Sequence, residues 1–272
     1  MEGNLAVLGA GKMGEALLSG LLRSGWRRPD QIIATDRYPE RLEELRSRYG
    51  VQTTLSNAEA ASRASVLLLA VKPQDMAELC DEIAPAIKPD VHLVISVAAG
   101  IRSAFIERRL PAGVPVVRCM SNTAVLVDEA MTVVSAGRHA DNAHLVIAEE
   151  IWGHVGSVIR LPEEHQDSVT ALSGSGPAYF FLLVEAMIDA GIMLGLPRAV
   201  STQLIVQTMS GAAKMLRETG KHPVELREMV TSPGGTTIAA IRELENHRVR
   251  AAFLDAIDAA RIRSRELASG HE

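Results

Sequence analysis

A glycine-rich turn close to the start of the chain restricts the possible folds most. The turn reads Gly-Ala-Gly-Lys-Met-Gly over residues 9–14. It follows the apolar run 5–8, which is typical of a buried strand, and precedes a stretch over 15–22 with helical periodicity. In this context the first glycine permits a tight turn, the second lets the backbone reach a pyrophosphate, and the third lets helix and strand pack closely. The pattern predicts a βαβ unit that binds a dinucleotide.

The next predicted strand, over residues 32–35, ends in Asp36 and Arg37, about 20 positions beyond Gly14. An acid at this distance accepts hydrogen bonds from the ribose of NAD and repels a 2′-phosphate, whereas an arginine pairs with the 2′-phosphate of NADP. The two residues therefore favour opposite cofactors. The side chain that faces the ribose decides between them, and the sequence leaves that choice open.

Strand-like and helical segments alternate up to about residue 161, with further strands expected over 65–71, 92–97, 115–120, 131–135 and 156–159. This alternation predicts an α/β fold of the Rossmann type, with a doubly wound, mostly parallel sheet. Beyond residue 163 the patterns are helical, over 175–194, 197–218, 223–230, 236–245 and 249–267. We expect a dinucleotide-binding domain over residues 1–162 and an all-α dimerisation and substrate domain over residues 163–272.

The helix expected over 178–196 is apolar almost all round and is interrupted only by Glu185 and Asp189. Its length is sufficient for a membrane span. Two acids four residues apart on one face argue against that interpretation. A helix of this kind is buried on all sides. One helical domain of this size is too small to cover it alone, so we expect a homodimer in which the C-terminal helices of a second copy of the chain enclose it. A core helix within a monomer remains the alternative.

Composition excludes several classes of function. The 272 residues are 47% hydrophobic and 22% charged, with a net charge of −5, which favours neither nucleic acid nor an anionic membrane as a partner. The two cysteines, Cys80 and Cys119, lie in apolar segments and indicate buried, reduced thiols in a cytoplasmic protein. The eight histidines show no metal-ligand spacing, so no metal site is expected. The first strand begins too early to leave room for a signal peptide.

Ligands of doubly wound sheets bind beyond the carboxyl ends of the strands. Polar or small residues occur at several of these ends and at the start of the helix that opens at Asn57. Asn57 is a candidate cofactor contact or only an N-cap, and Asn122 offers both a donor and an acceptor to a carboxamide. The full set of cofactor-binding candidates is Gly9, Ala10, Gly11, Lys12, Met13, Gly14, Asp36, Arg37, Asn57, Ala70, Val71, Lys72, Pro73, Ala98, Ala99, Gly100 and Asn122.

A second glycine loop lies between two helical patterns near the other end of the chain. It reads Thr-Ser-Pro-Gly-Gly-Thr-Thr over residues 231–237. Pro233 fixes one backbone angle, and the two glycines let the backbone approach a ligand closely. The first N–H groups of the following helix are then available to an anion. This loop is a candidate carboxylate or phosphate cradle that also carries hydroxyls; an ordinary capped loop is the alternative.

Several of these segments resemble pyrroline-5-carboxylate reductase. The resemblance covers nearly the whole chain and rests on segments 9–14, 70–73, 97–100, 118–123, 172–179 and 231–237. It implies reduction of 1-pyrroline-5-carboxylate, a cyclic imine carboxylate, to L-proline with NADPH, NADH being the possible second cofactor. This reaction is the last step of proline synthesis. The resemblance also implies a dimer through interlocked C-terminal helices, assembled to a larger ring such as a decamer.

The resemblance implies roles for individual residues. Thr237 matches the threonine that hydrogen-bonds the ring nitrogen of the substrate, which makes it the candidate catalytic residue. Glu163 falls near an acid of the substrate pocket, and Asn57 matches a cofactor contact. The carboxylate cradle corresponds to Ser232, Gly235, Thr236 and Thr237. The chain departs from many members at Ser121 and Ala124, where they have proline, and this departure affects the loop that carries Asn122.

Two other functions compete with this one. A dehydrogenase of the β-hydroxyacid type needs a lysine in its helical domain, and Lys214 is the candidate, although it reads most simply as a helix residue with a solvated head. A non-catalytic nucleotide sensor would keep the first glycine loop but would not need the hydroxyls of Ser232 and Thr237. Hydride transfer, which the cofactor itself carries, remains the favoured chemistry.

Overall fold

The computed structural model describes residues 3–269 and contains two compact units. The first consists of the residues up to Gly176 together with those from Ala260 on, and the second is Pro177–Ala259. The last strand ends at Arg160, close to the predicted boundary after residue 162. Packing extends the first unit further because Val169 belongs to a small core cluster with Met120 and Val133. The division into 1–162 and 163–272 stays a proposal about functional parts.

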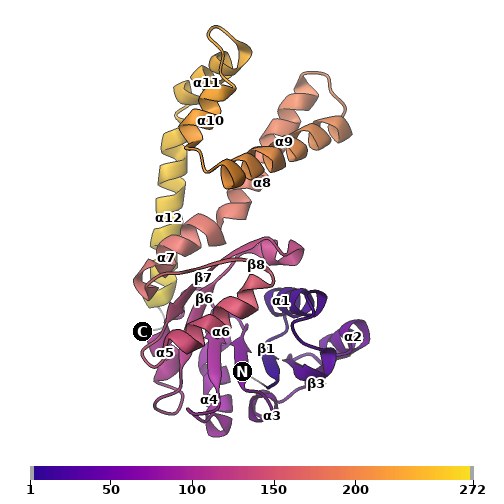
Figure 1. Ribbon diagram of the computed structural model, residues 1–272, viewed down its shortest axis with the longest axis vertical. Coiled ribbons are helices and arrows are strands. Elements are labelled where there is room, and N and C mark those ends of the chain that lie inside the picture. The colour runs from indigo at the N-terminus through magenta and orange to yellow at the C-terminus, as the bar shows by residue number, and fades with distance from the viewer. Residues whose placement is uncertain (1–2, 270–272) are drawn as a thin grey trace. The chain divides into compact units, whose positions relative to one another are not determined.

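The first unit, whose strands are drawn as arrows in Figure 1, is built on one eight-stranded sheet in the order β3-β2-β1-β4-β5-β6-β7-β8. The strands are β1 Leu5–Leu8, β2 Ile32–Thr35, β3 Gln52–Thr54, β4 Val66–Leu69, β5 Leu93–Ser96, β6 Val116–Met120, β7 Ala130–Ala136 and β8 Gly156–Arg160. Every neighbouring pair is parallel except β6 and β7, which are antiparallel. The predicted doubly wound, mostly parallel sheet is confirmed.

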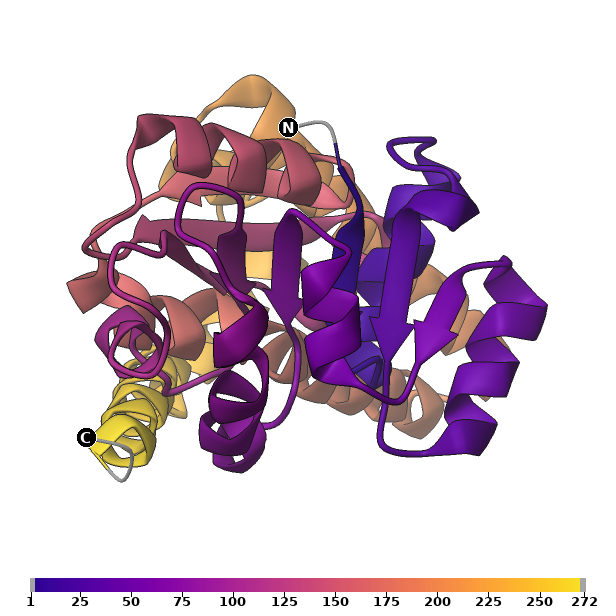
Figure 2. The ribbon, with the colours of Figure 1, turned by 90° about the horizontal axis from the view of Figure 1, so that it is seen from below.

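Helices cover both faces of this sheet, and Figure 2 shows them on either side of the strands. They are α1 Lys12–Arg23, α2 Pro39–Tyr49, α3 Asn57–Ser62, α4 Met76–Ile83, α5 Ser103–Glu107, α6 Asn142–Gly153 and α7 Gln166–Val169. Because strand side chains alternate between faces, the core separates into two clusters. Leu5 and Val7 pack with residues of α1, α2 and α6, and Ala6 and Leu8 pack with residues of α3, α4 and α5. Burial on both faces explains the unbroken apolar runs in the sequence.

The second unit is helical, as predicted. Its helices are α8 Gly176–Met193, α9 Arg198–Thr219, α10 Pro223–Met229 and α11 Thr236–Asn246, and it also holds the first part of α12, Val249–Ser269. Each begins and ends within two residues of the predicted range. Proline at the start of α10 and glycine after α9 explain these sharp ends, since proline fits a first helical turn and Gly220 takes the left-handed conformation with φ of +61°.

Helix α8 exposes most of its apolar side chains in the single chain. Phe181 and Leu182 are 65% and 68% exposed, and Met193 is 88% exposed. Among the described residues, one helical stretch, Glu163–Met193, is long and apolar enough to cross a membrane by length and composition. The same exposure is what a helix shows when its cover belongs to a second copy of the chain. Exposed apolar surfaces of this kind mark contacts with another protein chain or with a membrane.

Candidate active site

The three glycines of the loop after β1 have different surroundings. Gly9 has a φ of +90°, and a Cβ there would lie 2.9 Å from the backbone nitrogen of Val71. A Cβ on Gly14 would lie 2.6 Å from the carbonyl oxygen of Gly9. Gly11 is the N-cap of α1, and beyond its chain neighbours no described atom lies within 4 Å of its Cβ position. Gly9 and Gly14 are therefore needed for the packing of the loop, whereas the open side of Gly11 leaves its backbone accessible to a phosphate.

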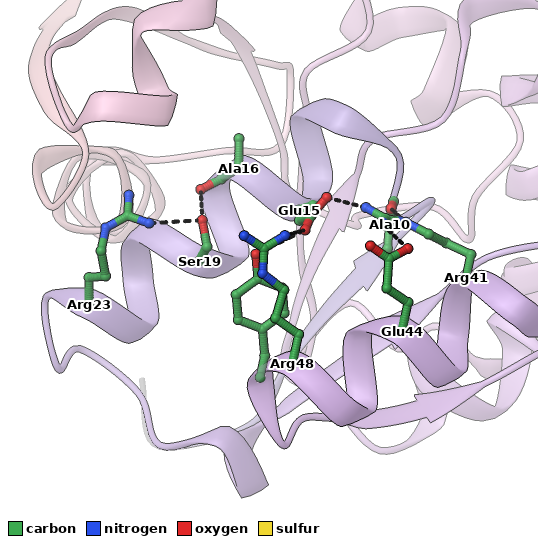
Figure 3. Close-up of polar contacts among 9 residues, drawn as sticks. Ala10, Glu15, Ala16, Ser19, Arg23, Arg41, Glu44 and Arg48 are labelled. Carbon is green, nitrogen blue, oxygen red and sulfur yellow. Dashed lines mark hydrogen bonds and ion pairs between the residues drawn. The ribbon is translucent and has the colours of Figure 1, made fainter.

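Arg41 of α2 contacts this loop and the first turn of α1 (Figure 3). Arg41 donates to the carbonyl oxygen of Ala10 at 3.2 Å and pairs with the carboxylate of Glu15 in the first turn of α1. Arg48 and Tyr49 donate to the same carboxylate at 3.2 and 2.9 Å. Burial acts to raise the pKa of Glu15, but the hydrogen bonds from Arg41 and Tyr49 and the neighbouring positive charges outweigh it, so that this pKa is lowered. Glu15 is therefore ionised at neutral pH and anchors the loop to α2.

Asp36 and Arg37 follow β2 directly, and the side chains of both residues form polar contacts within the chain. Oδ1 of Asp36 accepts a hydrogen bond from the backbone N–H of Tyr38 at 3.1 Å. Nη2 of Arg37 forms an ion pair with Oδ2 of Asp75 at 2.7 Å. The acid and the arginine both lie at the carboxyl end of β2, the position at which a bound dinucleotide places its ribose.

Asn57 connects this end of β2 to the helices on one face of the sheet. Its Oδ1 accepts from the hydroxyl of Thr35 at 2.6 Å, and its Nδ2 donates to Glu82 at 2.7 Å. The N-cap of α3 is Ser56, whose Oγ accepts from the backbone N–H of Glu59 at 3.1 Å. The alternative that Asn57 is only an N-cap is therefore wrong. Its side chain lies beside Thr35, the residue that precedes Asp36.

The loop after β4 lies against the glycine loop. The backbone N–H of Ala70 donates to the carbonyl oxygen of Leu8 at 2.8 Å, which extends the pairing of β1 and β4 to the loop itself. Lys72 is exposed, and Pro73 begins the short turn Pro73–Asp75. Ala70, Val71, Lys72 and Pro73 are thus grouped with residues 9–14, as the candidate cofactor site requires.

The loop after β5 combines small residues with a constrained glycine. Ala98 is buried and Ala99 is half-buried. Gly100 has a φ of +74°, and a Cβ there would lie 3.3 Å from the Cβ of Leu267 in the last turns of α12. Glycine at position 100 is therefore required by conformation and by this close approach, independently of any ligand.

Asn122 uses both groups of its amide within the chain. Oδ1 accepts from the backbone N–H of Ala124 at 3.1 Å, and Nδ2 donates to the carbonyl oxygen of Ser173 at 3.1 Å. Ser173 lies in the π-helical turn Thr170–Gly174, a type of turn that occurs frequently at functional sites. The amide therefore connects the end of β6 to the Ser-Gly-Ser-Gly-Pro segment. Ser121, the nearby departure from the family pattern, is buried and accepts from the hydroxyl of Thr132 at 2.8 Å.

The carboxylate of Glu163 is engaged within the first unit. Its oxygens accept from the backbone N–H and the hydroxyl of Ser103 at 2.7 and 2.6 Å, and from Nη1 of Arg118 at 3.3 Å. Arg118 is 2% exposed, and its Nε and Nη2 have no hydrogen-bond partner among the described residues. Sequence reasoning missed Ser103 and Arg118. An arginine inside the apolar run 115–120 was the signal that could have revealed this buried ion pair, because buried charges are paired.

The second glycine loop belongs to the second unit. The backbone N–H of Gly235 donates to the carbonyl oxygen of Ser232 at 3.1 Å, and Gly234 has a φ of +69°. With Pro233 between them, these residues form a reverse turn that needs glycine at its third position. Gly235 is the N-cap of α11, and no described side chain caps that helix. The first N–H groups of α11, next to the hydroxyls of Ser232 and Thr237, are therefore available to an anion.

The residues present fit a nicotinamide dinucleotide. The first unit gathers the glycine loop, Asp36, Arg37, Asn57 and the loops after β4 and β5 at the carboxyl ends of adjacent strands. The cradle over residues 232–237 is formed separately, in the second unit. Lys214, which the rival β-hydroxyacid dehydrogenase function would need, is exposed and pairs with Glu218 one turn along α9 at 3.6 Å.

Comparisons with known proteins agree with these two parts. The model for pyrroline-5-carboxylate reductase dimerisation matches residues 163–267, and the model for NADP oxidoreductase, coenzyme F420-dependent, matches residues 4–100. These matches confirm the predicted order of a Rossmann-type sheet followed by a helical dimerisation domain.

Curated relatives and solved structures extend the similarity over almost the whole chain. The pyrroline-5-carboxylate reductase of Corynebacterium melassecola is 46% identical over 97% of this chain and 98% of its own length, and that of Methanosarcina acetivorans is 42% identical over 97% of both. The structure of a pyrroline-5-carboxylate reductase from Coxiella burnetii has a TM-score of 0.92 with 38% identity, covering 98% of this chain and 99% of that one. The predicted resemblance is confirmed: the chain belongs to the pyrroline-5-carboxylate reductase family.

Proposed function

We infer that this chain reduces 1-pyrroline-5-carboxylate to L-proline with NADPH or NADH, and that the residues described above carry the reaction. The observation that supports these roles most directly is the uncapped start of α11 beside the Ser232 hydroxyl. A substrate carboxylate is the anion that such a cradle suits, because several N–H donors and a helix dipole converge there. A solved structure of the pyrroline carboxylate reductase of Plasmodium falciparum has NADP bound; it is 26% identical to this chain with a TM-score of 0.89 over 98% of each chain, and it supports the use of this cofactor class.

The first unit supplies the cofactor site in this proposal. Gly11 and the first N–H groups of α1 hold the pyrophosphate, and Asp36, Arg37 and Asn57 lie along the adenosine ribose. The loops after β4 and β5 then line the remainder of the dinucleotide, with Asn122 shaping the end of β6. When bound, the reduced nicotinamide would supply the hydride that adds to the imine carbon, the ring atom that becomes Cδ of proline, while the ring nitrogen takes its proton from solvent.

The second unit supplies the substrate contacts. Ser232, Gly235 and the backbone of Thr236 bind the carboxylate, and the hydroxyl of Thr237 hydrogen-bonds the ring nitrogen. Thr237 orients the imine but is too weak an acid to protonate it, so its contribution is positioning. Glu163, the remaining candidate contact, has its oxygens on Ser103 and Arg118 in this structure, which favours a supporting role over direct contact with the substrate.

We further propose that the active form is a homodimer formed through the C-terminal helices and assembled to a decamer in the cytoplasm. The exposed apolar side chains of α8 support a helical interface. Free, buried Cys80 and Cys119 are typical of a reducing compartment. Sedimentation of the purified protein tests the assembly, and a stable monomer would contradict it.

The decisive experiment follows NADH and NADPH oxidation with pyrroline-5-carboxylate in the wild type and in Thr237→Ala. We expect kcat to fall by about 10- to 100-fold in Thr237→Ala, while the Kd for the cofactor changes less than twofold, because a misplaced ring nitrogen loses alignment with the hydride donor. Thr219→Ala is the matched control, since its hydroxyl is bonded to the Met215 carbonyl at the end of α9. Unchanged turnover in Thr237→Ala would exclude the positioning role, and binding without imine reduction would favour the sensor.

A further inference from the structure

We propose that Asp75 determines the preference between NADH and NADPH by occupying the guanidinium that a 2′-phosphate would need. The inference rests on the proposed function for its biological meaning, but it concerns the cofactor site alone. It assigns a specificity-determining role to a residue outside the set that the sequence suggested.

The topology brings Asp75 to the adenosine side of the site. Strands β2 and β4 are the two neighbours of β1 in the sheet. Arg37 follows β2, and Asp75 ends the turn Pro73–Asp75 that follows β4. Their ion pair of 2.7 Å therefore joins the two loops on either side of the glycine loop. This is the region in which the ribose of a dinucleotide lies, next to the acid at the end of β2.

Arg37 is the cation that a 2′-phosphate at this ribose would meet. The next arginine along the chain, Arg41, is committed to the Ala10 carbonyl, Glu15 and Glu44. Arg37, by contrast, has an exposed side chain, 62% accessible, and its guanidinium forms an ion pair with Asp75. Lys72 is exposed next to Pro73, where its charge would attract the phosphates of either cofactor.

The carboxylates of Asp36 and Asp75 both disfavour the binding of a 2′-phosphate. The carboxylate of Asp36 is held at the end of β2 by the backbone N–H of Tyr38, and a ribose hydroxyl donates to such an acid. A 2′-phosphate carries additional negative charge, and it must compete with Asp75 for the guanidinium of Arg37 while it lies near Asp36. NADH makes neither demand, so Asp75 is expected to weaken the binding of NADPH relative to that of NADH.

Direct binding tests this role without any substrate. The Kd of NADH and of NADPH is measured by nicotinamide fluorescence for the wild type, Asp75→Asn, Arg37→Gln and the double variant. Asp75→Asn is expected to tighten NADPH binding by about three- to tenfold and to leave NADH within about twofold, as suits a partly exposed ion pair. Glu78→Gln is the matched control, because it removes an exposed acid three residues further on in α4.

The double variant separates competition from simple charge repulsion. If Asp75 acts by occupying Arg37, Asp75→Asn no longer tightens NADPH once Arg37 is replaced. An equal gain in the Arg37→Gln background, an equal gain for NADH, or an equal gain in Glu78→Gln would each overturn the proposal. If the wild type, assayed separately with pyrroline-5-carboxylate, reduces no imine while the binding shifts are intact, this result would instead count against the proposed function and leave the role of Asp75 standing.

Discussion

Gly11→Ala separates the ligand-facing glycine of the first loop from the two glycines that the loop needs for its own packing. No described atom outside its chain neighbours lies within 4 Å of its Cβ position, and its φ of −68° suits alanine. Stability is therefore expected to change by less than about 1 kcal/mol, since a poorer N-cap is offset by a less flexible unfolded chain. The added methyl lies where a pyrophosphate approaches, so one charge-assisted hydrogen bond, about 1.5–3 kcal/mol, is lost. This corresponds to about 10- to 100-fold in the Kd for NADPH.

The assay measures Kd by fluorescence titration and Tm by thermal unfolding of the apoprotein. Gly14→Ala provides the contrast, because its Cβ would lie 2.6 Å from the Gly9 carbonyl and 3.1 Å from Cγ1 of Val7. Forcing α1 away from β1 costs about 1–3 kcal/mol, or about 2–4 °C in Tm for each kcal/mol. A Gly11→Ala protein that binds NADPH like the wild type, or that melts as early as Gly14→Ala, would refute the assignment of the two glycines.

Two further substitutions test the buried charges of the first unit. Glu163→Gln is expected to destabilise the protein by about 2–4 kcal/mol, because Arg118 loses its counter-charge. The KM for the imine is expected to stay within about twofold. A raised KM, with the stability in urea unchanged, would instead make Glu163 a substrate contact. Glu15→Gln removes a carboxylate whose pKa is lowered by folding. Its contribution to stability, about 1–2 kcal/mol, is therefore full at neutral pH, begins to decline below the unfolded pKa of about 4.3, and is lost as the pH falls through the lowered folded-state pKa. Urea unfolding at pH 7 and at pH 3.5 should show a smaller stability difference between Glu15→Gln and wild type at the lower pH, and a constant difference would disprove the ion-pair explanation involving Arg41.

The regular elements follow from the sequence where apolar periodicity is strong. The buried strands β1 and β4 are unbroken apolar runs, and glycine or proline lies at the start or the end of each helix from α8 to α11. The edge strand β3 was not predicted, because Gln52, Thr53 and Thr54 are polar and only half-buried. An edge strand has a neighbour on one side alone, so its composition carries little of the pattern that identifies buried strands.

The sequence motifs pointed to candidate site residues, but not to the side-chain contacts between residues far apart in the chain. The motif spacing identified Asp36 and Arg37, yet nothing in the sequence indicates that Asp75, 38 residues beyond Arg37, pairs with it. Glu163 and Ser103 are likewise 60 residues apart. Contacts of this kind depend on strand order, which a single sequence does not contain. The individual roles of Thr237 and Ser232 stay predictions until the variants are measured.

The return of α12 to the first unit has a consequence for how the protein is made. Ser264 donates its hydroxyl to Asp167 at 2.7 Å, and the backbone of Leu267 and Ala268 packs against Gly100. Residues 260–269 leave the ribosome only after the whole of the second unit has been synthesised. The nascent dinucleotide-binding unit therefore emerges with the surface beside Gly100 uncovered, and its folding is completed only after residues 260–269 have been synthesised.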